Sequence, residues 1–153
     1  MSIKSIMTAA VFGMAATAAV ACPDENSDGQ QYVYLEEAFM PDPFVVSVAT
    51  GTGVDLGACR GDWLGEVSRT ATVEVYYEGG GEQLTFAFER DSDVDAVMMI
   101  YGASGVVFSD DVYDLDPVIT FDDPEAGTYM VWIGSVEGAR GMPGRLLITE
   151  MNY

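Results

Sequence analysis

The sequence predicts an all-β fold: an antiparallel two-sheet β-sandwich of jelly-roll or Greek-key type. Short runs rich in β-branched and aromatic residues alternate with clusters of Gly, Pro and Asp, which is the composition of strands and turns. Several of these runs alternate apolar and polar residues with a period of two. No segment has the apolar period of an amphipathic helix. Strands connected without helices favour two antiparallel sheets packed face to face.

The N-terminus is expected to lie outside this fold. An apolar run leads to the small residues Ala-Val-Ala at 19–21, as in a secretory signal peptide before its cleavage site. The run is shorter than the roughly 20 residues that a membrane-spanning helix needs. We therefore divide the chain into a signal peptide (1–21), a flexible polar lead-in (22–31) and a single β-sandwich domain (32–153).

The domain begins with two candidate strands and a long irregular segment. Residues 31–39 (QYVYLEEAF) and 44–50 (FVVSVAT) are rich in aromatic and β-branched residues and are separated by a proline-containing turn. Residues 51–65 (GTGVDLGACRGDWLG) form the longest stretch without a strand pattern. We expect this stretch to be a loop.

The next two candidate strands have the clearest alternation. In 70–77 (TATVEVYY) and 82–90 (EQLTFAFER), every second residue is apolar, so each strand presents one apolar face. The sequence EGGGE joins them, and glycines supply the positive φ angles of tight turns. The pattern therefore predicts a β-hairpin.

The remaining strands are of two kinds. Residues 95–102 (DAVMMIYG) and 126–135 (AGTYMVWIGS) are apolar almost throughout, which is typical of central strands covered on both faces. Three shorter or more polar runs frame them: 105–109, 117–123 and 144–151. The alternation leaves open which face Trp132 occupies. If it lies outside with Tyr76 and Met130, these residues would make an exposed binding platform.

Charge excludes one class of partner. The chain has six basic and 25 acidic residues, a net charge of −19, and removal of 1–21 makes it one unit more negative because Lys4 is lost. Nucleic acid is excluded as a partner, because its binding depends on Lys and Arg neutralising phosphates. The acid excess fits either solubility in a salty exterior or attraction of cations and basic partners. Composition alone leaves both open.

The two cysteines have alternative fates. An exported chain meets oxidising conditions, so Cys22 and Cys59 could form a disulfide. Cys22 also follows the small residues directly, as the acylated cysteine of a bacterial lipoprotein does. Ala19, where such signals usually have Leu, and Pro23, directly after the cysteine, argue against this lipid anchor.

Three segments resemble a known family. The sequence DSDVDAVMMIYGASG at 91–105, the stretch SDDVYDLDPVITFDDPEAGTYMVWIGS at 109–135 and the closing strand GRLLITE at 144–150 are similar to the bacterial pre-peptidase C-terminal (PPC) domain family and its small secreted relatives. The resemblance implies a jelly-roll-like sandwich that accompanies secreted enzymes or is exported alone, with no catalysis of its own. It also implies carboxylate-lined loops that bind calcium in some members.

Residue types limit the chemistry. The chain has no His, and Lys4 falls in the expected signal peptide, so catalytic triads, His-ligated zinc and Schiff-base chemistry are unavailable to the mature protein. A carboxylate-dependent hydrolase remains an alternative, since glycoside hydrolysis needs only two suitably spaced acids. The sequence selects no such pair among its acids.

The segment DSDVD begins like an EF-hand calcium loop but does not continue as one. Position six of the loop is Ala96 instead of Gly, and position twelve is Gly102 instead of Glu. A Ca²⁺ site of another design would need several carboxylates from neighbouring loops. If the loops around 91–95 and 109–116 share one end of the sandwich, the candidate ligands are Asp93, Asp95, Asp110 and Asp111. The alternative is that these residues only make solvated turns.

These patterns favour an exported protein, periplasmic or extracellular, that acts as a non-catalytic binding or accessory module, with Ca²⁺ as a candidate stabilising ion. The expected partner is an extracellular protein or polysaccharide. A lipid-anchored structural protein of the envelope and a carboxylate-dependent hydrolase are the alternatives.

Overall fold

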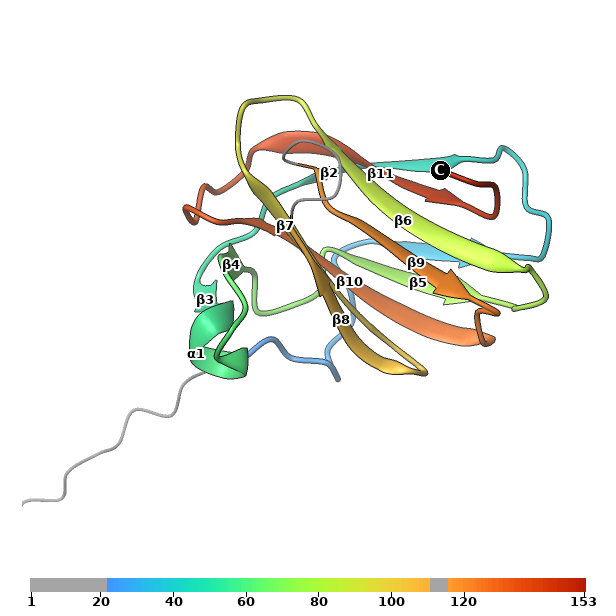
Figure 1. Cartoon of the computed structure of the whole chain (residues 1–153), viewed down its shortest axis with the longest axis horizontal. Coiled ribbons are helices and arrows are strands. Elements are labelled where there is room, and N and C mark those ends of the chain that lie inside the picture. Colours follow the sequence, from blue (N-terminus) through green and yellow to red (C-terminus); the bar gives the residue numbers. More distant parts are fainter. Residues whose placement is uncertain (1–21, 111–115) are drawn as a thin grey trace, which may run out of the picture.

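The computed structural model describes residues 22–110 and 116–153, which fold into two β-sheets packed face to face (Figure 1). Sheet A contains β1 (Tyr32–Leu35), β3 (Val54–Asp55), β4 (Glu66–Val67), β5 (Val73–Tyr77), β7 (Ala96–Gly102), β8 (Gly105–Ser109) and β10 (Gly127–Ser135). Sheet B contains β2 (Phe44–Ala49), β6 (Gln83–Arg90), β9 (Val118–Asp122) and β11 (Pro143–Thr149), in the order β2-β11-β6-β9. A short helix, α1 (Leu56–Arg60), lies between β3 and β4.

The structure confirms the predicted all-β, two-sheet sandwich. Each of the nine expected strands is present, and no strand end differs from its expected position by more than four residues. The strands β7 and β10 lie inside sheet A and are buried on both faces, as their apolar sequences indicate. Sheet A is not wholly antiparallel, because β1 pairs with β5 in parallel register.

The predicted β5–β6 hairpin is wrong. β5 pairs with β1 and β10 in sheet A, whereas β6 pairs with β11 and β9 in sheet B. Residues 78–82 therefore cross from one sheet to the other. Gly81 is required here for close packing: a Cβ at this position would collide with the Tyr77 hydroxyl and the Glu150 carboxylate. Alternation predicts which face is buried, and that face can pack against a facing sheet as well as within a hairpin.

The main hydrophobic core fills the space between the sheets. Phe86 and Phe121 from sheet B meet Tyr129 from sheet A, with ring centroids 5.2 to 6.0 Å apart. Such aromatic contacts add to the stabilisation from burial. The side chains that alternate inward on β5, β6 and β11 complete this core.

A second hydrophobic cluster lies on the outer face of sheet A. Residues 54–67, here called the cover, include β3, α1 and β4, which sit together at one end of the molecule (Figure 1). The expectation of a plain loop missed these elements. The Asp55 carboxylate caps α1 by accepting hydrogen bonds from the backbone N–H groups of Gly57 and Ala58. Beneath the cover, Trp132 is fully buried.

The cover approaches sheet A closely at β10. Ser135 of β10 pairs with Glu66 of β4. A Cβ at Gly134 would collide with the carbonyl oxygen of Glu66, so only glycine permits this contact. Trp63 of the cover stacks on Phe108 of β8 with ring centroids 5.1 Å apart. These contacts hold the cover over one half of the outer face.

Residues 22–31 lie against the sandwich. Cys22 is bonded to Cys59 of α1, with Cα atoms 5.6 Å apart. The backbone N–H of Asp24 donates to the Arg69 carbonyl at 2.8 Å, and that of Gln30 donates to the Ala71 carbonyl at 2.9 Å. The flexibility expected for this lead-in stays a prediction. The expected signal peptide at 1–21 lies outside the described residues, within which no helix is long and apolar enough to cross a membrane.

Candidate functional site

The candidate calcium ligands Asp93, Asp95, Asp110 and Asp111, here called the rim acids, lie partly within the described structure. Asp93 and Asp95 are in the loop between β6 and β7. Ser109 of β8 pairs with Met98 of β7, so Asp110 follows at the same end of sheet A. Asp111 lies outside the described residues. Among residues 22–110 and 116–153, no three His, Cys, Asp or Glu side chains are grouped to hold a metal ion. The calcium ligand set therefore stays a prediction.

Another carboxylate near this loop is already engaged. Asp116 forms an ion pair with Arg90 at 2.7 Å, and both side chains are largely shielded from water. The backbone N–H of Arg90 lies 3.5 Å from the same carboxylate oxygen. The Arg90 guanidinium thus compensates the charge of Asp116, as a bound metal ion would.

A groove lies between the two sheets at the β2 edge of sheet B. Its volume is about 710 Å³. β2 and β11 of sheet B contribute to its lining, together with residues that precede β1 and β5 of sheet A. We define the groove by the residues that line it: Gln30, Gln31, Ser47, Val48, Ala49, Thr50, Gly51, Thr52, Ser68, Thr72, Asp91, Arg140, Gly141, Pro143, Gly144 and Arg145.

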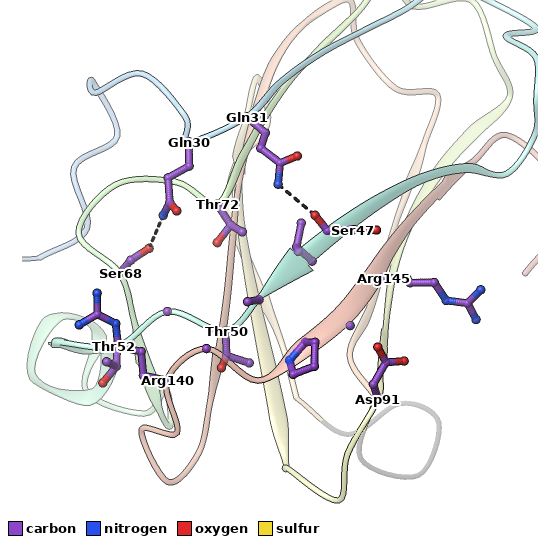
Figure 2. Close-up of a pocket in the computed structure, with 16 residues that line it drawn as sticks. Gln30, Gln31, Ser47, Thr50, Thr52, Ser68, Thr72, Asp91, Arg140 and Arg145 are labelled. Atoms are coloured by element: carbon purple, nitrogen blue, oxygen red, sulfur yellow. Dashed lines mark hydrogen bonds between the residues drawn. The ribbon is translucent and has the colours of Figure 1, made fainter.

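Side-chain amides connect the walls of the groove. The Gln31 amide donates from Nε2 to the carbonyl oxygen of Ser47 at 3.1 Å, which bridges the two sheets. The Gln30 amide donates to the hydroxyl of Ser68 at 3.4 Å. Figure 2 shows both hydrogen bonds on the same side of the groove. Each amide keeps a carbonyl oxygen that can accept a further hydrogen bond.

Two buried threonines make a fixed floor. The Thr50 hydroxyl donates to the carbonyl of Ala139 at 2.6 Å and accepts from the backbone N–H of Met142 at 3.1 Å. The Thr72 hydroxyl accepts from the backbone N–H of Ile133 at 3.1 Å. Because these hydroxyls are bonded to backbone groups, the floor keeps its shape when a ligand enters or leaves.

The groove lining includes two of the chain's five arginines, Arg140 and Arg145. Arg145 forms an ion pair with Glu89 outside the groove lining. Arg140 is exposed and has no ion pair among residues 22–110 and 116–153. In Figure 2, the two guanidinium groups stand on opposite sides of the polar side chains. The lining contains one carboxylate, that of Asp91.

Thr52 links the groove to the cover. Its hydroxyl donates to the carboxylate of Glu66, and the backbone N–H of Gly53 donates to the same carboxylate at 3.2 Å. These two hydrogen bonds lower the pKa of Glu66 below its usual range, the bond from Thr52 being the larger cause. Glu66 is thereby kept ionised and fixed to the groove wall.

The structure also locates the aromatic residues whose face the sequence left open. Trp132 and Met130 are buried beneath the cover, so they do not form an exposed platform. Of the three residues of that expected platform, only Tyr76 is exposed. Its ring stacks on that of Tyr34, which sequence reasoning did not select because the parallel β1–β5 pairing was not foreseen.

The disulfide bears on the alternative fates of Cys22. Its sulfur is bonded to Cys59 in this structure. A sulfur in a disulfide cannot carry a thioether-linked lipid at the same time. The two modifications therefore exclude each other in any one molecule.

Two solved structures are similar in shape to this chain. One is the pre-peptidase C-terminal domain of a collagenase from Bacillus anthracis, with a TM-score of 0.49 and 5% identity, covering 81% of this chain and 99% of that one. The other is a periplasmic inhibitor of g-type lysozyme from Aeromonas hydrophila, with a TM-score of 0.36 and 11% identity, covering 80% and 98%. The first is of the domain type that the sequence resembles. No family model and no curated protein matches the sequence.

Proposed function

We propose that this chain is an exported, non-catalytic binding module and that the groove between the two sheets is its site for a polysaccharide. One observation carries the proposal: the groove is lined by amides, hydroxyls and two guanidinium groups. The N-terminal signal pattern supports export.

The chemistry of the lining favours a sugar polymer. Sugar hydroxyls both donate and accept hydrogen bonds, and amide, carboxylate and guanidinium groups meet both needs. Pockets for apolar small molecules are instead lined mainly by hydrophobic and aromatic side chains. No aromatic residue lines this groove in the described structure. With a volume of about 710 Å³, the groove has room for more than one sugar ring.

Residue types support the proposed lack of catalysis. The mature chain lacks His and Lys as general bases or nucleophiles. A glycosidase needs two carboxylates across the scissile bond, and the groove lining contains only Asp91 among the described residues. The groove therefore offers a surface for holding a saccharide and not a pair for cleaving it.

The proposal is tested with the chain from Cys22 to Tyr153, its disulfide intact, titrated calorimetrically with neutral and uronic-acid oligosaccharides. Arg140→Gln is the test variant, because its guanidinium has no ion pair in the described structure and is available to a ligand. We expect it to weaken binding by about tenfold, which corresponds to one lost charge-assisted hydrogen bond. A stronger effect with the uronic-acid series would show that Arg140 contacts a carboxylate.

Arg69→Gln is the matched control, because Arg69 is also exposed but lies outside the groove lining. It should leave the affinity unchanged. The proposal fails if no oligosaccharide of either series binds, or if both variants weaken binding equally.

Calcium stabilisation is a separate proposal that rests on the rim acids. We expect millimolar Ca²⁺ to raise the thermal midpoint relative to excess EGTA, because a ligand specific to the folded state stabilises it. Asp93→Asn should abolish the increase. An unchanged midpoint in wild-type protein would contradict it.

A further inference from the structure

Three tyrosines stand together on the half of the outer face of sheet A that the cover leaves bare. Tyr32 and Tyr34 of β1 are 62% and 47% exposed, and Tyr76 of β5 is 37% exposed. In the parallel pairing of β1 with β5, Tyr34 lies opposite Tyr76 and Tyr32 lies opposite Glu74. We call Tyr32, Tyr34 and Tyr76 the tyrosine surface.

The two paired rings are aligned. The rings of Tyr34 and Tyr76 are parallel, with an interplanar angle of 0° and centroids 5.8 Å apart. Single exposed aromatic residues are common on protein surfaces, but adjacent ones on a rigid sheet indicate a contact site. Tyrosine also loses little conformational entropy on binding, because only two side-chain torsions become fixed.

Carboxylates surround the rings. The Tyr34 hydroxyl donates to the carboxylate of Glu78. Glu74 of β5 lies opposite Tyr32, and its carboxylate accepts from the backbone N–H of Gly29 at 3.1 Å. Glu36 follows β1 directly and is exposed. The described residues contribute no arginine to these strands, so the local charge has the sign of the whole chain.

A small hollow adjoins the tyrosine surface. It has a volume of about 240 Å³ and is lined by Tyr34, Leu35, Glu36, Phe39, Met40 and Phe44. Five of its six lining residues have apolar or aromatic side chains, and Glu36 is the one charged residue among them. This combination suits a long basic side chain, whose methylene stem packs on the apolar side chains while its charged end meets the carboxylate.

We propose that the tyrosine surface binds a basic, arginine- or lysine-rich segment of a partner protein. Cations are attracted to the faces of tyrosine rings within about 6 Å of the centroid, and the neighbouring carboxylates form charge-assisted hydrogen bonds with them. A mature chain with a large excess of acids attracts such a partner over a longer range. This surface is distinct from the groove, and its function does not depend on the groove binding a saccharide.

The test uses the disulfide-bonded chain from Cys22 to Tyr153 and a fluorescent eight-residue arginine-rich peptide, with its glutamine-substituted counterpart as the neutral probe. Fluorescence anisotropy at physiological ionic strength measures the affinity. We expect the basic peptide to bind and the neutral one not to bind. The double variant Tyr34→Leu/Tyr76→Leu should weaken binding by about tenfold. Glu78→Gln should weaken it about threefold.

Two controls separate the surface from general charge attraction. Tyr101→Leu removes an equally exposed tyrosine from β7, which β10 separates from β5. Asp62→Asn removes one charge from an exposed residue of the cover, away from the tyrosine surface. Both should retain wild-type affinity, and circular dichroism melts verify that every variant is folded. Equal weakening by the controls, or binding of a neutral oligosaccharide at the tyrosine surface in place of the peptide, would overturn the proposal.

Discussion

The two halves of the outer face of sheet A differ in exposure. At β7 and β10, Met99 and Trp132 lie beneath the cover and are almost fully buried. At β1 and β5, Tyr34 and Tyr76 lie bare. Both halves come from strands with large apolar or aromatic side chains. The apolar outer face of β7 and β10 is thus covered by a segment remote in sequence, whereas the tyrosines of β1 and β5 lie outside that cover.

Two neighbouring tyrosines of β5 also differ in exposure. Tyr76 is 37% exposed, whereas Tyr77 points into the core and is fully buried. The Tyr77 hydroxyl donates to the Glu150 carboxylate and accepts from the backbone N–H of Gly81 at 2.9 Å. One tyrosine is thus available to a partner, and the other holds the two sheets together.

The largest effect is expected from removing the tryptophan beneath the cover. Trp132→Ala should lower the free energy of unfolding by about 4 kcal/mol, because it leaves a large cavity in a closed cluster. Tyr76→Ala, on the bare half, should change it by only about 0.5 kcal/mol. Urea unfolding followed by circular dichroism measures both. Similar losses for the two variants would remove the distinction between the halves.

The disulfide should matter almost as much. Cys22→Ala/Cys59→Ala should cost about 3 kcal/mol, because the bond spans 37 positions and restricts the unfolded chain. Cys59 also packs against the cluster beneath the cover. Quenching of tryptophan fluorescence by acrylamide should therefore increase in this variant, while the affinity of the tyrosine surface stays unchanged. Quenching that remains at the wild-type level would mean that the cover stays closed without the bond.

Alkaline pH should distinguish the buried tyrosine from the exposed ones. Burial, followed by the hydrogen bond to Glu150, raises the pKa of Tyr77 to about 12. Because the folded-state pKa is above the unfolded value of about 10, the contribution of Tyr77 to folding stability is complete below pH 10. It is lost as pH rises towards 12. Tyr77→Phe should cost about 1 to 2 kcal/mol at pH 8, because two polar partners lose their hydrogen bond. Unfolding midpoints from pH 8 to 12 should fall less steeply in the variant.

Tyr34 provides the matched comparison. Its hydrogen bond to Glu78 raises its pKa to about 12 as well, but its side chain is exposed to solvent. Tyr34→Phe should therefore have a smaller effect on the same pH series than Tyr77→Phe. The reverse order would contradict the assignment of the buried and bare positions.

The smallest effect is expected at the junction of the cover and the groove. Thr52→Val removes the hydrogen bond that most lowers the pKa of Glu66. A carboxyl group with a lowered folded-state pKa stabilises the fold above its unfolded pKa and loses this contribution as pH falls through the folded value. We expect a loss of about 0.3 kcal/mol at pH 7 that shrinks as the pH falls below the unfolded pKa and the carboxyl group becomes protonated. A loss of the same size at pH 3 would show that packing, and not the carboxylate, is responsible.

The strands could be predicted from the sequence, but the surfaces could not. Period-two alternation gives the inward face of β5, β6 and β11, and continuous apolar runs identify β7 and β10 as central. Alternation contains no information on which strands pair. The β5–β6 connection was therefore assigned to a hairpin, and the parallel β1–β5 pairing was missed.

The groove and the tyrosine surface depend on that pairing. The groove combines side chains as far apart in sequence as Gln30 and Arg145, and no local pattern connects them. The stacking of Tyr34 on Tyr76 follows from one register of a parallel pair. The cover was read as a loop because β3 and β4 have two residues each, too few to show a period. An N-cap residue, Asp55, directly before Leu56 is the signal that could have identified α1, and the expectation of a loop did not use it.

The central claim, that the outer face of sheet A has a structural half and a recognition half, is tested most directly by nuclear magnetic resonance. The ¹⁵N-labelled chain is titrated with the arginine-rich peptide, and backbone amide shifts are followed. We expect the largest shifts at 32–36 and 74–78, with none at the cover, 54–67. Shifts centred on the cover, or spread evenly over all acidic loops, would contradict the claim.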